Sequence, residues 1–182
     1  MADRIIESNP ENVPDIPEVL EKALLFLLNE SREMLEAGKD VTPRTALVIG
    51  DKLFEESADA ASVEACYARA MHTVRNAKGA RAYGFVYDGY VEVDDQTIDA
   101  IIAEGGFPGE PQGYALGWVY DVAEDGSIAF ESEATYIGFA PNFMSELRPS
   151  RIDQPEEPVE EQAEASVEVA ADAESDEAPT AE

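Results

Sequence analysis

Positive charge is scarce in this chain. It has 12 Lys and Arg residues against 40 Asp and Glu residues, which gives a formal net charge of −28 over 182 residues. Binding to DNA, RNA or anionic lipid depends on basic side chains that neutralise phosphate groups. The sequence therefore predicts neither a nucleic-acid partner nor a membrane partner, and it favours a basic protein as the partner.

Cysteine and histidine occur once each, as Cys66 and His72. A single cysteine excludes an intramolecular disulfide and a multi-cysteine metal site. On a helix, six steps of about 100° place these two side chains about 120° apart, so they cannot form a nucleophile–base pair. Phosphate-binding glycine motifs and calcium-loop patterns are also absent from the sequence. We expect no cofactor and no metal.

Long apolar runs are absent as well. The longest one, residues 23–28, has six residues, whereas a membrane-spanning helix needs about 20. The first twelve residues are largely polar, unlike a secretory signal with its basic start and apolar core. The sequence therefore predicts a cytoplasmic protein.

The last 31 residues contain no Lys, Arg or aromatic residue and hold twelve Asp and Glu residues. Their few apolar side chains bury too little area to offset about 1–2 kcal/mol of backbone entropy per residue, and their like charges repel. We expect residues 148–182 to be a disordered acidic tail, 1–14 to be an N-terminal extension, and 15–147 to be a single domain. Residues 1–151 are acidic in their own right, with 28 acidic and 12 basic residues.

Two stretches have the 3.6-residue apolar spacing of amphipathic helices. The first predicts a helix over 18–37, with Asp15 as its N-cap and Gly38 as its left-handed C-terminal cap. The second predicts a helix over 60–77, which ends before Gly79.

Most of the remaining domain alternates between apolar and polar residues, as antiparallel strands do. A two-residue turn at 94–95 sets Phe85 opposite Glu104 and Tyr87 opposite Ile102. One face of this hairpin is then apolar except for its last pair. Its other face carries Asp88 and Asp99, which we expect to be solvated.

A second hairpin is predicted around a three-residue turn that ends at Gly126 in the left-handed conformation. This register sets Tyr120 against Phe130 and Leu116 against Ala134. The alternative two-residue turn would place aromatic side chains against carboxylates. The aromatic residues of this hairpin are therefore predicted to be core, and a base-stacking surface is disfavoured.

The predicted order of elements is α-β-β-α-β-β-β-β, with a short hairpin around Gly50-Asp51 as the first pair of strands. Sequential hairpins with two amphipathic helices are typical of α+β folds. We expect a two-layer α+β domain in which a mostly antiparallel sheet carries both helices on one face.

One loop stands out, the Gly- and Pro-rich stretch Gly105–Gly113. Glu104 lies at its start on the apolar face of the hairpin, and Glu110 lies within it. Buried carboxyl groups beside loops are typical of acid–base sites. Glu104 and Glu110 are therefore the candidate catalytic residues, although nothing in their spacing defines a motif.

Three functional interpretations remain open. The first, which electrostatics favours, is a non-enzymatic protein-binding or regulatory module, such as an inhibitor or immunity-like protein, that docks on a basic partner. The second is a small carboxylate-based hydrolase or isomerase that uses Glu104 near the Gly/Pro loop. The third is a homodimeric scaffold, because Leu25 and Phe26 widen the apolar stripe of the first helix beyond what one sheet contact needs.

Overall fold

The computed structural model describes residues 13–93 and 96–149. The predicted acidic tail from residue 150 onward, the extension up to residue 12 and the turn at 94–95 lie outside these residues. Within them, no helix is both long and apolar enough to span a bilayer. The elements in chain order are α1 (Glu18–Glu36), β1 (Arg44–Ile49), β2 (Lys52–Ser57), α2 (Val63–Asn76), β3 (Ala80–Val93), β4 (Gln96–Gly106), β5 (Gln112–Val122), β6 (Ile128–Phe130) and β7 (Thr135–Pro141).

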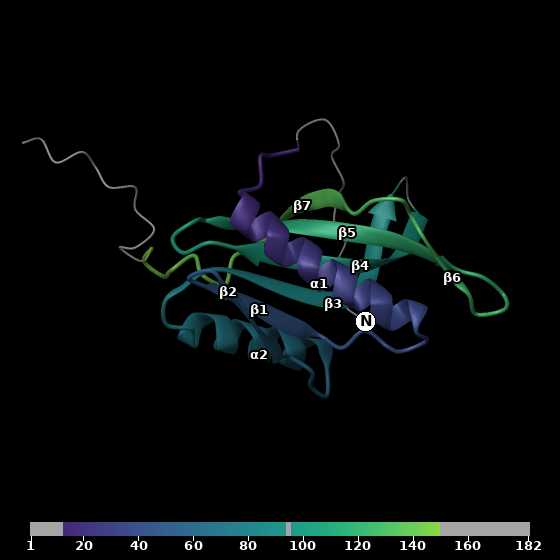
Figure 1. Ribbon diagram of the computed structural model, residues 1–182, viewed down its shortest axis with the longest axis horizontal. Helices are drawn as coiled ribbons and strands as arrows, with labels where there is room; N and C mark the ends of the chain where they lie inside the picture. Colours follow the sequence, from purple (N-terminus) through teal and green to yellow (C-terminus); the bar gives the residue numbers. More distant parts are fainter. Residues whose placement is uncertain (1–12, 94–95, 150–182) are drawn as a thin grey trace, which may run out of the picture.

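The strands form one antiparallel sheet in the order β2-β1-β3-β4-β5-β6, and β7 also pairs with β5 (Figure 1). β6 and β7 follow one another along the same edge of β5, since β6 pairs with residues 120–122 and β7 with residues 112–117. The predicted α+β class and antiparallel sheet are confirmed. The single final strand that the sequence predicts is in fact two short strands.

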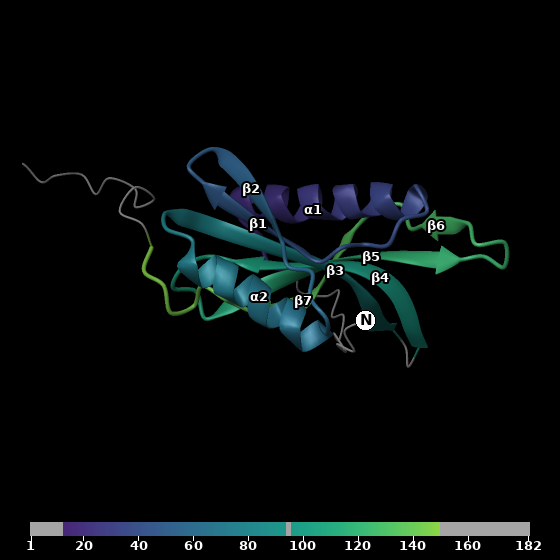
Figure 2. The same ribbon diagram turned by 90° about the horizontal axis from the view of Figure 1, so that it is seen from below.

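The two helices cover opposite faces of the sheet (Figure 2). Leu24 of α1 packs in one core cluster with Val86 and Ile101, whereas Val74 of α2 packs in the other with Ile102. The predicted two-layer arrangement with both helices on one face is therefore wrong, and the domain has three layers. Consecutive residues of β4 are apolar on both faces because both faces are buried.

The predicted register of the β3–β4 hairpin is confirmed. Phe85 lies opposite Glu104 and Tyr87 lies opposite Ile102. The β1–β2 hairpin around Gly50-Asp51 is also as predicted, with Ile49 paired to Lys52 across the turn.

The second predicted hairpin is only partly correct. Gly126 has a φ of 81° and Tyr120 pairs with Phe130, as predicted. Leu116, however, pairs with Tyr136 instead of Ala134. The chain leaves the sheet over residues 131–134.

A hydrogen bond explains where this departure begins. The indole Nε1 of Trp118, which is buried under α1, donates to the carbonyl of Glu131 at 2.8 Å. A buried indole N–H needs such a partner. The guanidinium of Arg32 from α1 lies over the same indole, 4.7 Å from the ring centroid. These contacts hold the chain at a point that alternation alone does not reveal.

The helix ends follow local rules with one exception. Gly38 ends α1 with a φ of 69°, and its N–H donates to the carbonyl of Leu35 at 2.9 Å. Pro17 occupies the N-cap of α1 and no side chain caps it, so the prediction of Asp15 as N-cap is wrong. The residue before a proline prefers an extended backbone, which keeps Asp15 too far from the first turn.

Two glycines provide the surface on which α1 rests. Gly84 of β3 and Gly105 of β4 lie opposite each other. A Cβ on Gly84 would lie 2.8 Å from Leu27 Cδ1, and one on Gly105 would lie 2.2 Å from the carbonyl oxygen of Tyr83. α1 packs closely over these two strands because both positions lack a side chain.

The predicted Gly/Pro loop Gly105–Gly113 is accordingly shorter than expected. Gly105 and Gly106 belong to β4, and Gly113 belongs to β5. Only residues 107–111 lie outside the strands. The glycines at the two ends are needed for close packing between strands and helix, and not for a flexible active-site loop.

Candidate functional site

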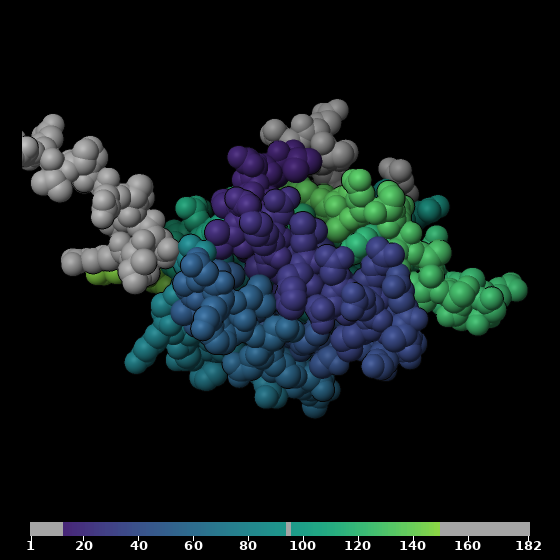
Figure 3. All heavy atoms as spheres, in the orientation of Figure 1, coloured from purple at the N-terminus to yellow at the C-terminus, as the bar shows by residue number. Residues whose placement is uncertain are grey.

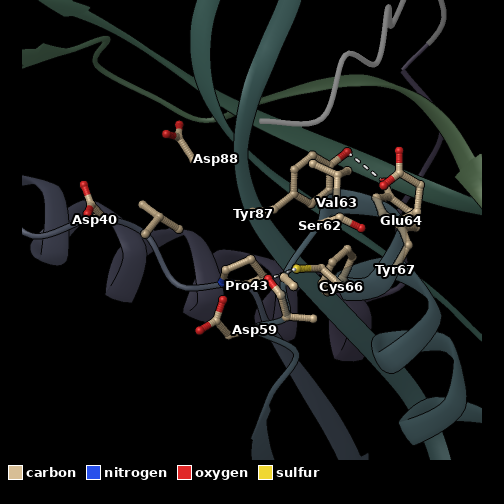
Figure 4. Close-up of a pocket in the computed structure, with 14 residues that line it drawn as sticks. Asp40, Pro43, Asp59, Ser62, Val63, Glu64, Cys66, Tyr67, Tyr87 and Asp88 are labelled. Carbon is tan, nitrogen blue, oxygen red and sulfur yellow. Dashed lines mark hydrogen bonds between the residues drawn. The ribbon is translucent and has the colours of Figure 1, made fainter.

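A pocket of about 620 Å³ opens at the point where β3 extends beyond β1 (Figure 4). β1 pairs with β3 only as far as Val86, and the next two residues of β3, Tyr87 and Asp88, line the pocket. Loops 37–43 and 58–62 and the start of α2 form the other walls. The lining residues are Asp40, Val41, Pro43, Asp59, Ala60, Ala61, Ser62, Val63, Glu64, Cys66, Tyr67, Phe85, Tyr87 and Asp88.

Four carboxylates surround this pocket. Asp40 comes from the loop after α1, Asp59 from the loop before α2, Glu64 from the first turn of α2, and Asp88 from β3 (Figure 4). The lining residues that the structure describes include no Lys, Arg or His. Because like charges gather in one concave region, the pocket concentrates negative potential.

Two of these carboxylates have shifted pKa values. Hydrogen bonds from its own backbone N–H and from the Ser62 hydroxyl lower the pKa of Glu64. Burial raises the pKa of Asp88, although the hydrogen bond from the hydroxyl of Tyr120, at 2.7 Å, opposes the shift. The sequence predicts a solvated Asp88. It is half-buried instead, because α1 covers the face of the sheet toward which it points.

The raised pKa of Asp88 predicts a pH-dependent effect of the Asp88→Asn substitution. The folded state binds the Asp88 proton more tightly than the unfolded state, so charging Asp88 lowers stability as pH rises above about 4. We expect Asp88→Asn to raise the melting temperature at pH 7 by about 1–2 °C, and to lose this gain when the pH falls to about 3.5. Thermal unfolding at both pH values measures it. A lower melting temperature at pH 7 would show that the Tyr120 hydrogen bond outweighs desolvation.

Aromatic rings form the inner wall of the pocket. The Tyr67 and Phe85 rings meet edge to face, with centroids 5.1 Å apart. The Tyr67 ring also lies 5.7 Å from the Tyr87 ring, and the two phenol oxygens are 3.1 Å apart within a hydrogen bond (Figure 4). The carboxylates therefore share a pocket with an aromatic wall, whereas the Asp88 side chain points toward the opposite face of the sheet, where it meets Tyr120.

Glu104 lies behind these phenols and is fully buried, with 0% of its surface exposed. Its Oε1 accepts hydrogen bonds from the hydroxyl of Tyr87 at 2.6 Å and from the hydroxyl of Tyr67 at 3.0 Å. Burial, and then the nearby carboxyl group of Glu104, raise the pKa of Tyr87. Glu104 holds the two phenols in place and is not itself among the residues that line the pocket.

Glu110, the predicted partner of Glu104, is exposed in the loop between β4 and β5. Its carbonyl oxygen accepts a hydrogen bond from the side chain of Asn142 at 2.7 Å. A substrate that contacts Glu110 from solvent would not reach the buried Glu104 directly. A catalytic role for either residue stays a prediction.

Cys66 and His72 each have a separate partner in the structure. Cys66 is buried, and its Sγ lies 3.7 Å from the carbonyl oxygen of Ala60. The ring of His72 is within hydrogen-bonding distance, 3.3 Å, of the Asn76 side chain on the same helix. Among the described residues, no three His, Cys, Asp or Glu side chains are placed to hold a metal ion.

Sequence reasoning missed most of this pocket. Asp40, Asp59 and Glu64 come from two loops and a helix start, and no shared spacing connects them. Tyr67 belongs to the apolar stripe of α2, which only indicates that it faces the core. The Ser62 N-cap, whose Oγ accepts from the backbone N–H of Ala65 at 3.3 Å, is the one local signal near the site.

Comparison of the chain with protein-family models, with curated proteins and with solved structures finds no match.

Proposed function

We propose that this protein is a non-enzymatic binding module that docks on a basic protein and receives a Lys or Arg side chain of that partner in the pocket. One observation carries the proposal: four carboxylates and an aromatic wall line the same pocket, with no basic residue among the described lining residues. An inhibitor or an immunity-like regulator of a basic protein is a function of this kind.

The chemistry of the pocket suits a cationic side chain. Aromatic rings attract ammonium and guanidinium groups, and the partly exposed ring of Tyr67 lines the pocket beside Glu64, with the buried ring of Tyr87 next to it. Carboxylates accept charge-assisted hydrogen bonds from the same groups. The volume of about 620 Å³ exceeds what one side chain fills, so residues that flank the cation in the partner have room to enter.

The rest of the chain would assist the encounter. The formal net charge of all 182 residues, the pocket included, is −28, and charge of one sign raises the association rate with a partner of opposite sign. This contribution is screened by salt. We therefore expect affinity for the partner to fall as ionic strength rises.

A cationic peptide tests the pocket directly. We expect an eight-residue arginine-rich peptide to bind the full chain, and the double variant Asp59→Asn/Glu64→Gln to weaken binding about tenfold, since each lost charge contact accounts for roughly a threefold change in affinity. Isothermal titration calorimetry at about 0.05 and about 0.3 M salt measures both this loss and the effect of screening.

The matched control removes two negative charges elsewhere. Glu21 and Glu33 are exposed on α1, on the other side of the sheet from α2. The double variant Glu21→Gln/Glu33→Gln should change the affinity less than about twofold. Equal losses in the two double variants would mean that only net charge matters and that the pocket is not the site.

One observation favours the second candidate, a carboxylate-based hydrolase or isomerase. Tyr67 and Tyr87 line the pocket and also hydrogen-bond to Glu104, so the phenols connect the pocket to a buried carboxyl group. Glu104→Gln should abolish activity in such an enzyme and leave the binding of a basic partner largely intact.

The homodimer through α1 has less support. Leu25 is only partly exposed and packs against the core cluster under α1. Phe26 remains exposed at 37%. Of the two side chains that suggest a homodimer, Leu25 therefore already packs within its own domain.

A further inference from the structure

The edge strand β2 is the most open part of the sheet. All six of its residues are exposed, and it stands at the end of the strand order, paired only with β1 among the described strands. Leu53 is 36% and Phe54 47% exposed. The hairpin lies at the surface beside α1 in the space-filling view (Figure 3, blue beside purple). A strand with an open edge and apolar side chains is a template for a further strand.

The backbone of β2 determines which residues can bond to that further strand. The N–H of Ala58 donates to the carbonyl of Pro43 at 2.8 Å, so this pair is hydrogen-bonded. Hydrogen-bonded pairs alternate along an antiparallel ladder. Residues 52, 54 and 56 therefore bond toward β1, whereas residues 53, 55 and 57 direct their N–H and C=O groups outward.

This alternation restricts how two copies of β2 can pair antiparallel about a two-fold axis. The outward N–H and C=O groups of residues 53, 55 and 57 in one copy must face the same residues of the other copy. Because these residues alternate along β2, the two-fold axis has to pass through a residue and not between two residues. An axis at Glu55 places that carboxylate against its own copy. An axis at Leu53 places Asp51 against Glu55. An axis at Phe54 places Lys52 against Glu56 and leaves Phe54 against Phe54.

Only the axis at Phe54 brings unlike charges together. On the face shared with α2, it sets a Phe54–Phe54 pair between two Lys52–Glu56 pairs, and directly opposed residues of this kind stabilise antiparallel strands. On the other face, Leu53 meets Glu55, whose carboxylate already lies 3.5 Å from the guanidinium of Arg44. The charge of Glu55 is thus compensated within its own chain.

We propose that β2 is a self-pairing edge, through which two copies of this chain associate antiparallel about a two-fold axis at Phe54 and continue their sheets into one. The occupant is a second copy because the strand is complementary to itself in this one register. A basic strand from another protein would leave Lys52 without an opposite charge.

Sedimentation equilibrium of the full chain tests this pairing at about 0.15 M salt. The screening length there is about 8 Å, which retains contacts between facing side chains and reduces the repulsion between two acidic chains. The interface is small, so we expect a dimer with a Kd of about 10–100 µM.

Charge exchange across the axis provides the decisive variants. Lys52→Glu sets Glu against Glu56, and Glu56→Lys sets Lys against Lys52, so each single variant should weaken the dimer about tenfold. The first makes the chain more negative and the second makes it less negative. The double variant Lys52→Glu/Glu56→Lys restores unlike pairs at the original net charge and should return the Kd to within about threefold of the original.

All of these positions are exposed, so the variants should fold, and circular dichroism checks that they do. A chain that stays monomeric up to about 500 µM would overturn the proposal. A dimer that both single variants leave unchanged would also overturn it, and would place the interface elsewhere, such as on α1. A double variant as weak as the single variants would refute the register.

Discussion

Replacing Gly105 with Ala is expected to lower the free energy of unfolding by about 3 kcal/mol. The added Cβ would lie 2.2 Å from the carbonyl oxygen of Tyr83 and 2.8 Å from Leu20 Cδ1. The first neighbour is backbone in the adjacent strand and cannot move without disturbing the sheet. The second belongs to α1, which would have to rise from the surface on which it packs.

Urea denaturation and thermal unfolding both measure this effect, and the melting temperature should fall by roughly 10 °C. Gly126→Ala is the matched control, because Gly126 has a φ of 81° but no atom within 4 Å of the position that a Cβ would take. It should cost about 1 kcal/mol through backbone strain alone. If the two variants lose equal stability, close packing under α1 is not what requires Gly105.

Tyr87→Phe is expected to be the second most damaging change, at about 2 kcal/mol. The substitution removes the hydrogen bond of 2.6 Å that the Tyr87 hydroxyl donates to Glu104. The carboxyl group stays fully buried and keeps the hydrogen bond from Tyr67, but the loss of a donor to a buried carboxyl group is costly. The ring itself is retained, so the packing of the core is little changed.

A double-mutant cycle separates this hydrogen bond from other effects. In the Glu104→Gln background, Tyr87→Phe should cost about 1 kcal/mol less than in the original chain, because the strong acceptor is already gone. Chemical denaturation of the four proteins gives the coupling energy. Additive losses would mean that the Tyr87 hydroxyl stabilises the fold through some contact other than Glu104.

Part of this structure follows from short-range rules. The register that sets Phe85 opposite Glu104 depends on the alternation of two neighbouring strands, and it predicts that Glu104 is buried. Tyr87 lies opposite Ile102, so it is the diagonal neighbour of Glu104 on the same face. One of the two phenols that bind this carboxyl group was therefore within reach of the sequence alone.

The placement of the helices on opposite faces of the sheet does not follow from the sequence pattern alone. An amphipathic stripe shows that a helix has one apolar face, but it does not tell which face of the sheet that helix covers. The run Ala100–Ala103 in β4 was the available signal, since a strand that is apolar on both sides lies between two layers. Alternation in the rest of the hairpin predicts a single covered face, whereas this run indicates that both faces of β4 are covered.

The pocket is even less predictable from the sequence than the placement of the helices. Its carboxylates belong to segments that are brought together only because β1 is shorter than β3, so that loops 37–43 and 58–62 meet beside the uncovered end of β3. Asp40 and Asp88 are 48 residues apart in the chain. Periodicity describes neighbours within one element, and it carries no information about such a meeting.

The edge of the sheet opposite β2 is interrupted, and this has a consequence for solubility at high concentration. This edge is formed by β6 and β7: the chain leaves the sheet over residues 131–134, the pairing with β5 shifts between Ala115 and Leu116, and β7 ends at Pro141. Such interruptions prevent another molecule from adding strands in sequence. Since β2 would be consumed in joining two copies, growth would stop at a pair, and open-ended fibres would have no second attachment point.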